Sequence, residues 1–188
     1  MTGYNVVLFL HITSVIVMFG CLGADWVAIG GLRSARTAGQ AEPWVRTLEV
    51  SASIGPWARL AVLGAGLFLA IDAWSWQGWI IVGLAGWVAY VVLGEPLTGR
   101  ELREVGALVR SADGDLSPVA TATLRHPRMW NAVLVRAGLG AGIVFCMVTK
   151  PPAPAAAVAV ILGAAAGLVA ARLTTRPARR IPTTHQAS

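Results

Sequence analysis

Residue types that could hold a redox-active ligand recur along one apolar segment near the N-terminus. Ser14, Met18, Cys21 and Asp25 follow His11 at offsets of three, seven, ten and fourteen residues. At about 100° per residue these positions stay within about 80° of His11 on a helix, so we expect them to share one face that points into a bundle. Histidine and soft sulfur ligands suit a haem or a copper ion. His11 and Met18 would be about 10 Å apart along the axis, so other helices would have to contribute ligands.

Four further polar or sulfur-containing residues are expected near the level of His11, at the ends of other apolar segments: Asp72, Cys146, Met147 and Lys150. We hypothesise that His11 holds a copper ion or a haem together with Met18, Cys146 or Met147. Asp72 would accept one ring N–H of His11 and leave the other nitrogen for the ligand. The alternative is structural: Lys150 satisfies Asp72, and His11 is an ordinary hydrogen-bonded core residue.

Asp25, Arg59 and Arg136 form a second polar group, expected near the opposite ends of their apolar segments. An unpaired charge is costly inside a membrane, so we predict an ion pair between Asp25 and either Arg59 or Arg136. A stabilising pair is one interpretation, and a conduction or proton-relay role is the other. The sequence shows no catalytic triad, paired carboxylates at hydrolase spacing, phosphate loop or zinc motif, and it predicts no catalytic residue.

Five apolar stretches must position these residues: Val6–Ile29, Trp57–Ala73, Gly78–Leu93, Asn131–Val148 and Ala155–Ala171. At about 1.5 Å rise per residue, each covers roughly 25 Å or more, enough to cross a bilayer core. Only 13% of the 188 residues are charged and 56% are hydrophobic, whereas a soluble domain normally carries about 25% charge.

The predicted fold is therefore an all-α, polytopic membrane helix bundle. Residues 1–151 would form an antiparallel four-helix core with a cytoplasmic helical loop at 95–130. Residues 152–172 would form a fifth, peripheral transmembrane helix, and 173–188 a basic, disordered cytoplasmic tail.

The arginine distribution predicts the orientation. The loops after the first and third stretches and the C-terminal tail are rich in arginine, whereas Ser75-Trp76-Gln77 holds none and the turn after the fourth stretch holds only Lys150. The positive-inside rule then places the N-terminus outside and the C-terminus in the cytoplasm of a bacterial inner (plasma) membrane. The net charge of +6 lies at the ends of apolar runs, so the expected partner is the lipid bilayer and not nucleic acid. Cys21 and Cys146 would lie at different depths, which predicts no disulfide.

The cytoplasmic loops are expected to contain helices. Apolar residues recur at helical spacing in 43–52 and 96–112, which would extend the second and third spans or lie on the headgroups. Ser117-Pro118 can cap another short helix, which Pro127 interrupts.

Two glycine motifs mark packing faces. Gly138-x-x-x-Gly142 and Gly163-x-x-x-Gly167 let helix backbones approach closely. We expect them to pack the fourth and fifth spans within the chain first, and to support a homo-oligomer or a membrane-protein partner second.

Three short motifs carry a family resemblance: Phe9-Leu10-His11-Ile12, Gly55-Pro56 and Met147-Val148-Thr149-Lys150-Pro151. Over residues 4–151 the chain resembles an uncharacterised (DUF-type) family of predicted bacterial integral membrane proteins with a Leu-His start and a Met-Val-x-Lys-Pro end. This family is similar in pattern to copper-resistance D-type membrane proteins. The resemblance implies a four-helix membrane core and no established activity. The chain departs from the family at Val17-Met18-Phe19-Gly20, where the family often has Trp-x-Gly.

Three functions are compatible with this sequence. The first is an inner-membrane protein that handles copper or haem in a pocket at its outer side. The second is a non-catalytic subunit or assembly factor of a larger complex. The third is a small transporter, which five spans without a detectable repeat make the least favoured.

Overall fold

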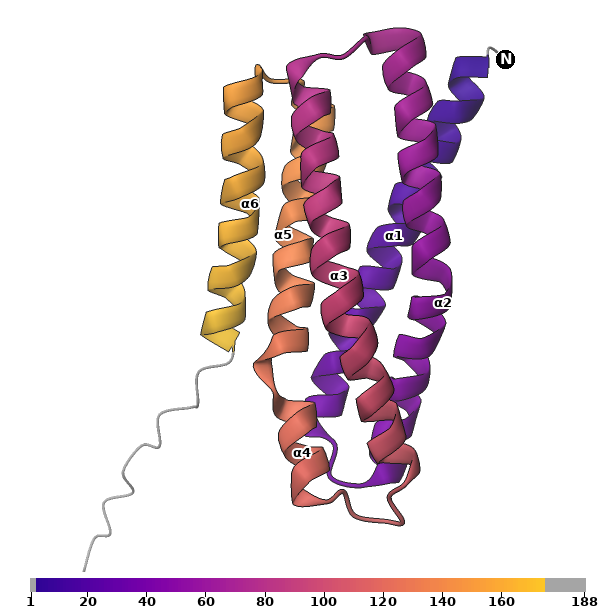
Figure 1. The fold of residues 1–188 in the computed structure, drawn as a ribbon, viewed down its shortest axis with the longest axis vertical. Coiled ribbons are helices and arrows are strands. Elements are labelled where there is room, and N and C mark those ends of the chain that lie inside the picture. Colours follow the sequence, from indigo (N-terminus) through magenta and orange to yellow (C-terminus); the bar gives the residue numbers. More distant parts are fainter. Residues whose placement is uncertain (1–2, 175–188) are drawn as a thin grey trace, which may run out of the picture.

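The computed structural model describes residues 3–174, without the side chains of residues 95–99. In chain order its helices are α1 (Gly3–Ser34), α2 (Ala38–Leu69), the short π-helix η1 (Ala70–Trp74), α3 (Gly78–Arg110), α4 (Pro118–Arg125), α5 (Pro127–Thr149) and α6 (Ala153–Thr174). Consecutive long helices run in opposite directions and form an elongated bundle (Figure 1). The predicted all-α class is confirmed for the described residues.

Within residues 3–174, four helical segments are long and apolar enough to cross a membrane: Gly3–Ser34, Ala38–Trp74, Pro118–Thr149 and Ala153–Thr174. The apolar part of α3, Gly78–Gly94, is shorter. α1 alone has 32 residues and is therefore about 48 Å long, more than a bilayer core requires. The chain thus has the composition and helix lengths of a membrane protein, with helical turns to spare beyond the apolar layer.

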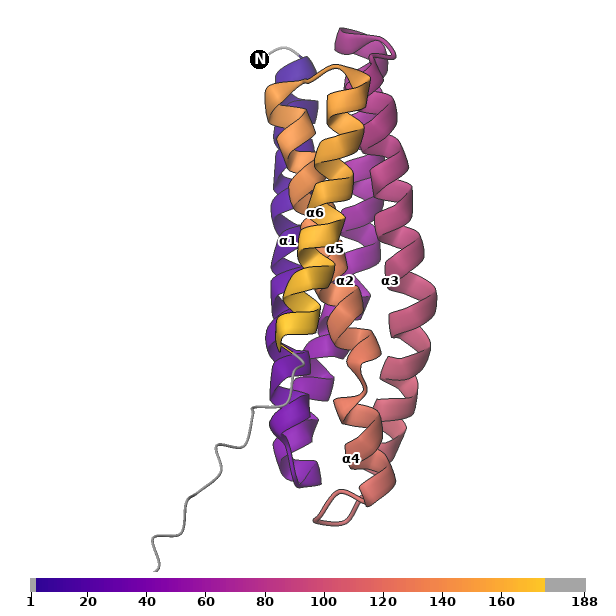
Figure 2. The ribbon, with the colours of Figure 1, turned by 90° about the vertical axis from the view of Figure 1, so that its left-hand side faces the viewer.

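The helices pack as two groups. α1 lies mainly against α2, whereas α5 lies between α3 and α6 (Figures 1 and 2). The predicted glycine contact between the last two spans is confirmed: a Cβ atom at Gly142 would lie 2.8 Å from the Cα of Val160, and one at Gly138 would collide with the backbone of Gly163. These glycines bring α5 and α6 into backbone contact. α6 packs on α5 and, less closely, on α3, and it lies at the edge of the bundle (Figure 1).

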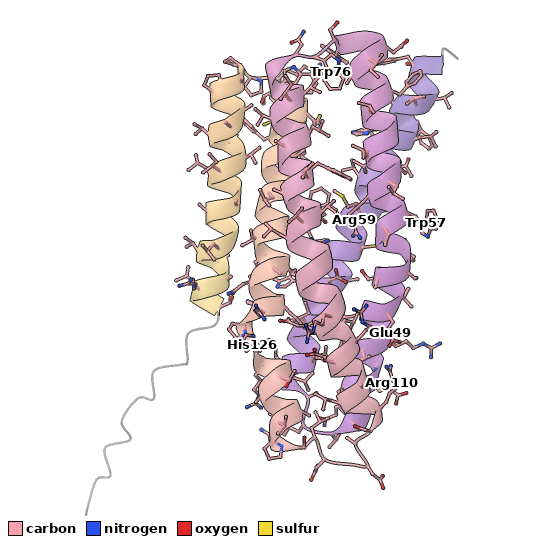
Figure 3. The ribbon with its side chains drawn as sticks, in the orientation of Figure 1. Glu49, Trp57, Arg59, Trp76, Arg110 and His126 are labelled. Carbon is pink, nitrogen blue, oxygen red and sulfur yellow. The ribbon has the colours of Figure 1, made fainter. Side chains whose placement is uncertain are left out.

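We name the two ends of the bundle after features at each end. The Trp76 end carries the α2–α3 connection, and the α4 end carries the short helix α4 (Figure 3). Most of the large apolar side chains with almost no exposed surface lie toward the α4 end, including Leu32, Val105 and Val133. The loops that join α1 to α2 and α3 to α4 also meet there: the N–H of Ala38 donates to Gly114 O at 2.8 Å, and that of Leu116 donates to Arg36 O at 3.0 Å. The bundle is therefore closed at the α4 end.

The expected loop helices prove to be parts of longer ones. α2 continues through Pro43 and Pro56, and α3 is helical to Arg110, so the segments at 43–52 and 96–112 extend the long helices instead of lying apart from them. The predicted short helix is α4, whose N-cap residue Ser117 accepts a hydrogen bond from the N–H of Ala120 at 3.1 Å. Of the predicted basic tail, residues 175–188 lie outside the described part of the chain.

Candidate ligand cavity

A cavity of about 440 Å³ lies in the half of the bundle toward the Trp76 end. α1, α2, η1, α3 and α5 all contribute to its wall, so it separates the α1–α2 pair from α3 and α5. The wall is dominated by aliphatic and aromatic side chains, among them Phe19, Trp74, Trp79 and Trp87. Its volume and apolar character are those of a site for a drug-sized or cofactor-sized molecule.

His11 is a polar group on this wall, and its ring is held by α2. The Nδ1–H donates to the carbonyl oxygen of Val62 at 3.1 Å. Gly66 makes this approach feasible, because a Cβ there would lie 3.0 Å from His11 Cε1 and 3.3 Å from Nδ1. In this tautomer Nε2 keeps its lone pair, which is the arrangement that orients a ligating histidine. The acceptor is thus a backbone carbonyl, where the sequence suggested the Asp72 carboxylate.

The predicted sulfur ligands divide between two places. Met18 and Met147 line the same cavity as His11, and Met147 reaches across to α3, where a Cβ at Gly83 would lie 3.1 Å from its methyl carbon. Cys146 is fully buried, and its thiol lies 3.6 Å from the carbonyl oxygen of Ala156 on the α6 side. The one-residue step from Met147 to Cys146 turns the side chain by about 100° around the helix, which explains why neighbours in sequence face different helices.

Among the described residues, Asp72 contacts neither His11 nor Lys150 in the way that the sequence suggested. Asp72 is exposed in η1 and does not contribute to the cavity wall. The Lys150 ammonium lies 3.7 Å from the ring centre of Trp74, whose ring meets that of Trp79 edge to face at 5.9 Å. Lys150 ends α5 in the left-handed conformation (φ 49°), which turns the chain toward α6. This lysine therefore places a positive charge over an aromatic ring at the mouth of the cavity, and not beside the histidine.

The inner limit of the cavity is Tyr90, which is 1% exposed. The guanidinium carbon of Arg136 lies 4.6 Å from the centre of the Tyr90 ring, and Arg136 is itself 5% exposed. Gly94 leaves room for it, since a Cβ there would lie 2.9 Å from Arg136 Cζ. Tyr90 therefore separates the cavity from a buried charge.

The second predicted polar group lies behind Tyr90. Asp25 interacts with Ser51 and, electrostatically, with both Arg136 and Arg59, and Figure 3 shows Arg59 directed into the bundle while Trp57 points away from it. Four helices thus bring polar groups together in one cluster, in which Ser51, Tyr90 and Arg136 are buried. The predicted pair of Asp25 with Arg136 does not form as a direct contact: Arg136 Nε has no hydrogen-bond partner among the described residues, and the two charges interact at longer range. Sequence reasoning missed Tyr90 and Ser51. A tyrosine in the middle of an apolar stretch could have indicated a polar contact, because its hydroxyl needs a partner when it is buried. A single serine gives no such indication.

Within residues 3–174, no group of three or more histidine, cysteine, aspartate or glutamate side chains could hold a metal ion. What the cavity offers instead is one oriented imidazole with two thioethers in an apolar, tryptophan-lined space. Such a donor set suits the iron of a large planar cofactor better than a bare hydrated ion, because the wall then packs against the cofactor's ring. Comparison of the chain with protein-family models, curated proteins and solved structures finds no match.

Proposed function

We propose that this protein is a bacterial inner-membrane protein with five spans: the four long apolar segments and the shorter apolar part of α3, Gly78–Gly94. The Trp76 end would face outward and the α4 end the cytoplasm. The distribution of arginines supports this orientation, because Arg33, Arg103 and Arg125 belong to the α4 end, whereas the Lys and Arg side chains described near the other end come down to Lys150.

We propose further that the cavity binds a haem-type cofactor, which His11 would hold. The observation that carries the proposal is the His11 ring on the cavity wall, with Nδ1–H held by the Val62 carbonyl. His11 would hold the iron through Nε2, together with Met18 or Met147. When bound, haem would supply one-electron chemistry at the outer side of the membrane.

The other residues of the cavity would bind and shield the cofactor. The tryptophans on α3 and η1 provide flat apolar surfaces against which a planar ring packs. Lys150 at the mouth would attract the acidic groups of the cofactor toward the aqueous edge. Tyr90 would end the site on the inner side and keep the cofactor from the buried charges around Arg136.

An absorption spectrum of the full chain, purified in detergent from cells supplied with a haem precursor, tests the proposal. We expect a Soret band with a stoichiometry near one haem per chain, lost in His11→Ala with α-helical circular dichroism retained. The matched control is Ser14→Ala, because the Ser14 hydroxyl is engaged by Leu10 O of its own helix. If the wild-type chain takes up no haem under reconstitution with excess hemin, the proposal is wrong, and a non-catalytic subunit becomes the better interpretation.

A further inference from the structure

A positively charged side chain that forms no ion pair with any described side chain lies near the C-terminal ends of α1 and α6 and the start of α5. Arg33, in the last turn of α1, is half-buried, and its Nη1 has no exposed surface and no hydrogen-bond partner within the described part of the chain. The contact that the structure shows for its guanidinium is with the Trp130 ring, 5.5 Å from the ring centre. A half-buried cation that packs on an aromatic ring is only partly compensated, so an anion is expected to join it.

On the proposed five-span arrangement, on which this inference rests, one end of α6 would lie at the boundary of the bilayer, at the level of this site. α6 has 22 residues and is about 33 Å long, close to the thickness of the hydrocarbon layer. The indole N–H of Trp130 donates to the hydroxyl of Thr174, the last described residue of α6, at 2.6 Å. Because Arg33 packs on Trp130, its charge lies at the same level as the end of α6. The anion that a membrane supplies in abundance at this level is a lipid phosphate.

The surroundings of Arg33 match an amphipathic ligand. Trp26 is 50% exposed and lies 6.4 Å from Trp130 between ring centres, so two tryptophans form an aromatic surface beside the cation. Arg172, in the last turn of α6, adds a second positive charge near Thr174. Aromatic rings that pack against glycerol and the first methylenes, beside arginines that bind phosphate, are typical of lipid sites at the membrane interface.

We propose that the Arg33–Trp130 site binds the phosphate group of an anionic phospholipid. The Arg33 guanidinium would hold the phosphate oxygens through charge-assisted hydrogen bonds, and Trp26 and Trp130 would contact the lipid at the headgroup boundary. The Trp130–Thr174 hydrogen bond holds the indole in place, and the Arg33 guanidinium packs on that indole. This site is separate from the cavity, which lies toward the Trp76 end.

Native mass spectrometry of the full chain in detergent, titrated with phosphatidylglycerol or phosphatidylcholine, tests the proposal. Wild-type protein should retain one phosphatidylglycerol in preference to phosphatidylcholine. Arg33→Gln should weaken phosphatidylglycerol binding by about fivefold to tenfold, since one interfacial arginine is worth about 1 kcal/mol. Arg33→Lys should keep part of the preference because it keeps the charge, and Arg46→Gln, which removes an exposed arginine of α2, serves as the matched control.

Three results would overturn the assignment. One is equal binding of the two lipids by wild-type protein. Another is an equal loss of affinity in Arg33→Gln and Arg46→Gln, which would mean a diffuse effect of net charge. The third is displacement of phosphatidylglycerol by low-millimolar inorganic phosphate, which would identify a site for the free ion. If Arg33→Gln does not fold, Trp130→Phe provides the test instead, since it keeps an aromatic ring but loses the Thr174 hydrogen bond and should also reduce the preference.

Discussion

Replacing Gly142 by alanine should separate α5 from α6 and destabilise the bundle. The new Cβ would lie 2.8 Å from Val160 Cα and 2.9 Å from Ala159 O, whereas ordinary van der Waals contacts are 3.4–4 Å. The two backbones must therefore move apart locally by about 0.6–1.2 Å, since neither contact atom belongs to a flexible side chain. Overpacking of this kind costs about 1–3 kcal/mol.

The same substitution also changes helix propensity, and Gly23→Ala isolates that part. Gly23 lies inside α1, is exposed, and has nothing within 4 Å of its would-be Cβ. Alanine there should stabilise the helix by about 0.5–1 kcal/mol. Because Gly142→Ala gains a similar amount from propensity, the difference between the two variants reports the steric cost alone, about 1–3 kcal/mol.

Unfolding of both variants by sodium dodecyl sulfate in mixed micelles, followed by circular dichroism, provides the measurement. We expect Gly23→Ala to unfold at a higher mole fraction of the denaturing detergent than wild type, and Gly142→Ala at a lower one. If the two variants unfold together, the close approach of α5 and α6 does not contribute to stability, and the reasoning from the glycine motifs is refuted.

Three further predictions concern the cavity, the buried cluster and α4. Gly66→Ala should press on the His11 ring and lower haem uptake in reconstitution severalfold at unchanged helicity; uptake equal to wild type would mean that the ring position is unimportant. Asp25→Asn and Arg136→Gln should each destabilise the bundle in detergent unfolding, with a coupling of about 0.5–3 kcal/mol between them because the two charges attract each other; full additivity would contradict that attraction. Ser117→Ala should cost about 1 kcal/mol and raise hydrogen exchange of the α4 amides, whereas unchanged exchange would show that the cap is dispensable.

The fold could be predicted from the sequence where local chemistry decides it. Apolar stretches of spanning length and the Ser117 cap are both short-range features. The continuation of α2 through Pro43 and Pro56 was harder to foresee, because a proline usually marks a helix start or a break. Here α2 packs along α1 and α3, and it stays helical through both prolines.

The candidate site was less predictable than the fold. The face shared by His11 and Met18 follows from helical periodicity, and the structure places both on the cavity wall. The role of the Val62 carbonyl as hydrogen-bond acceptor could not be predicted, because every residue has a backbone carbonyl. The orientation of Cys146 toward α6 depends on how α5 is rotated within the bundle. The cavity itself arises from the divergence of two helix pairs, and no local pattern encodes that divergence.

The hydrogen bonds between the α1–α2 and α3–α4 loops have a consequence for how the cavity exchanges its contents. They tie the two helix groups together at one extremity, where Thr37 and Asp115 also form a bridge. The two helix groups are therefore joined at both ends of the bundle: by these hydrogen bonds at the α4 end, and by the three-residue Ser75–Gln77 connection at the Trp76 end, next to the cavity. Breaking the hydrogen bonds between the two loops should loosen the whole bundle. Lengthening the Ser75–Gln77 connection should instead let the helix groups separate at the Trp76 end alone, and so speed exchange of a molecule bound in the cavity.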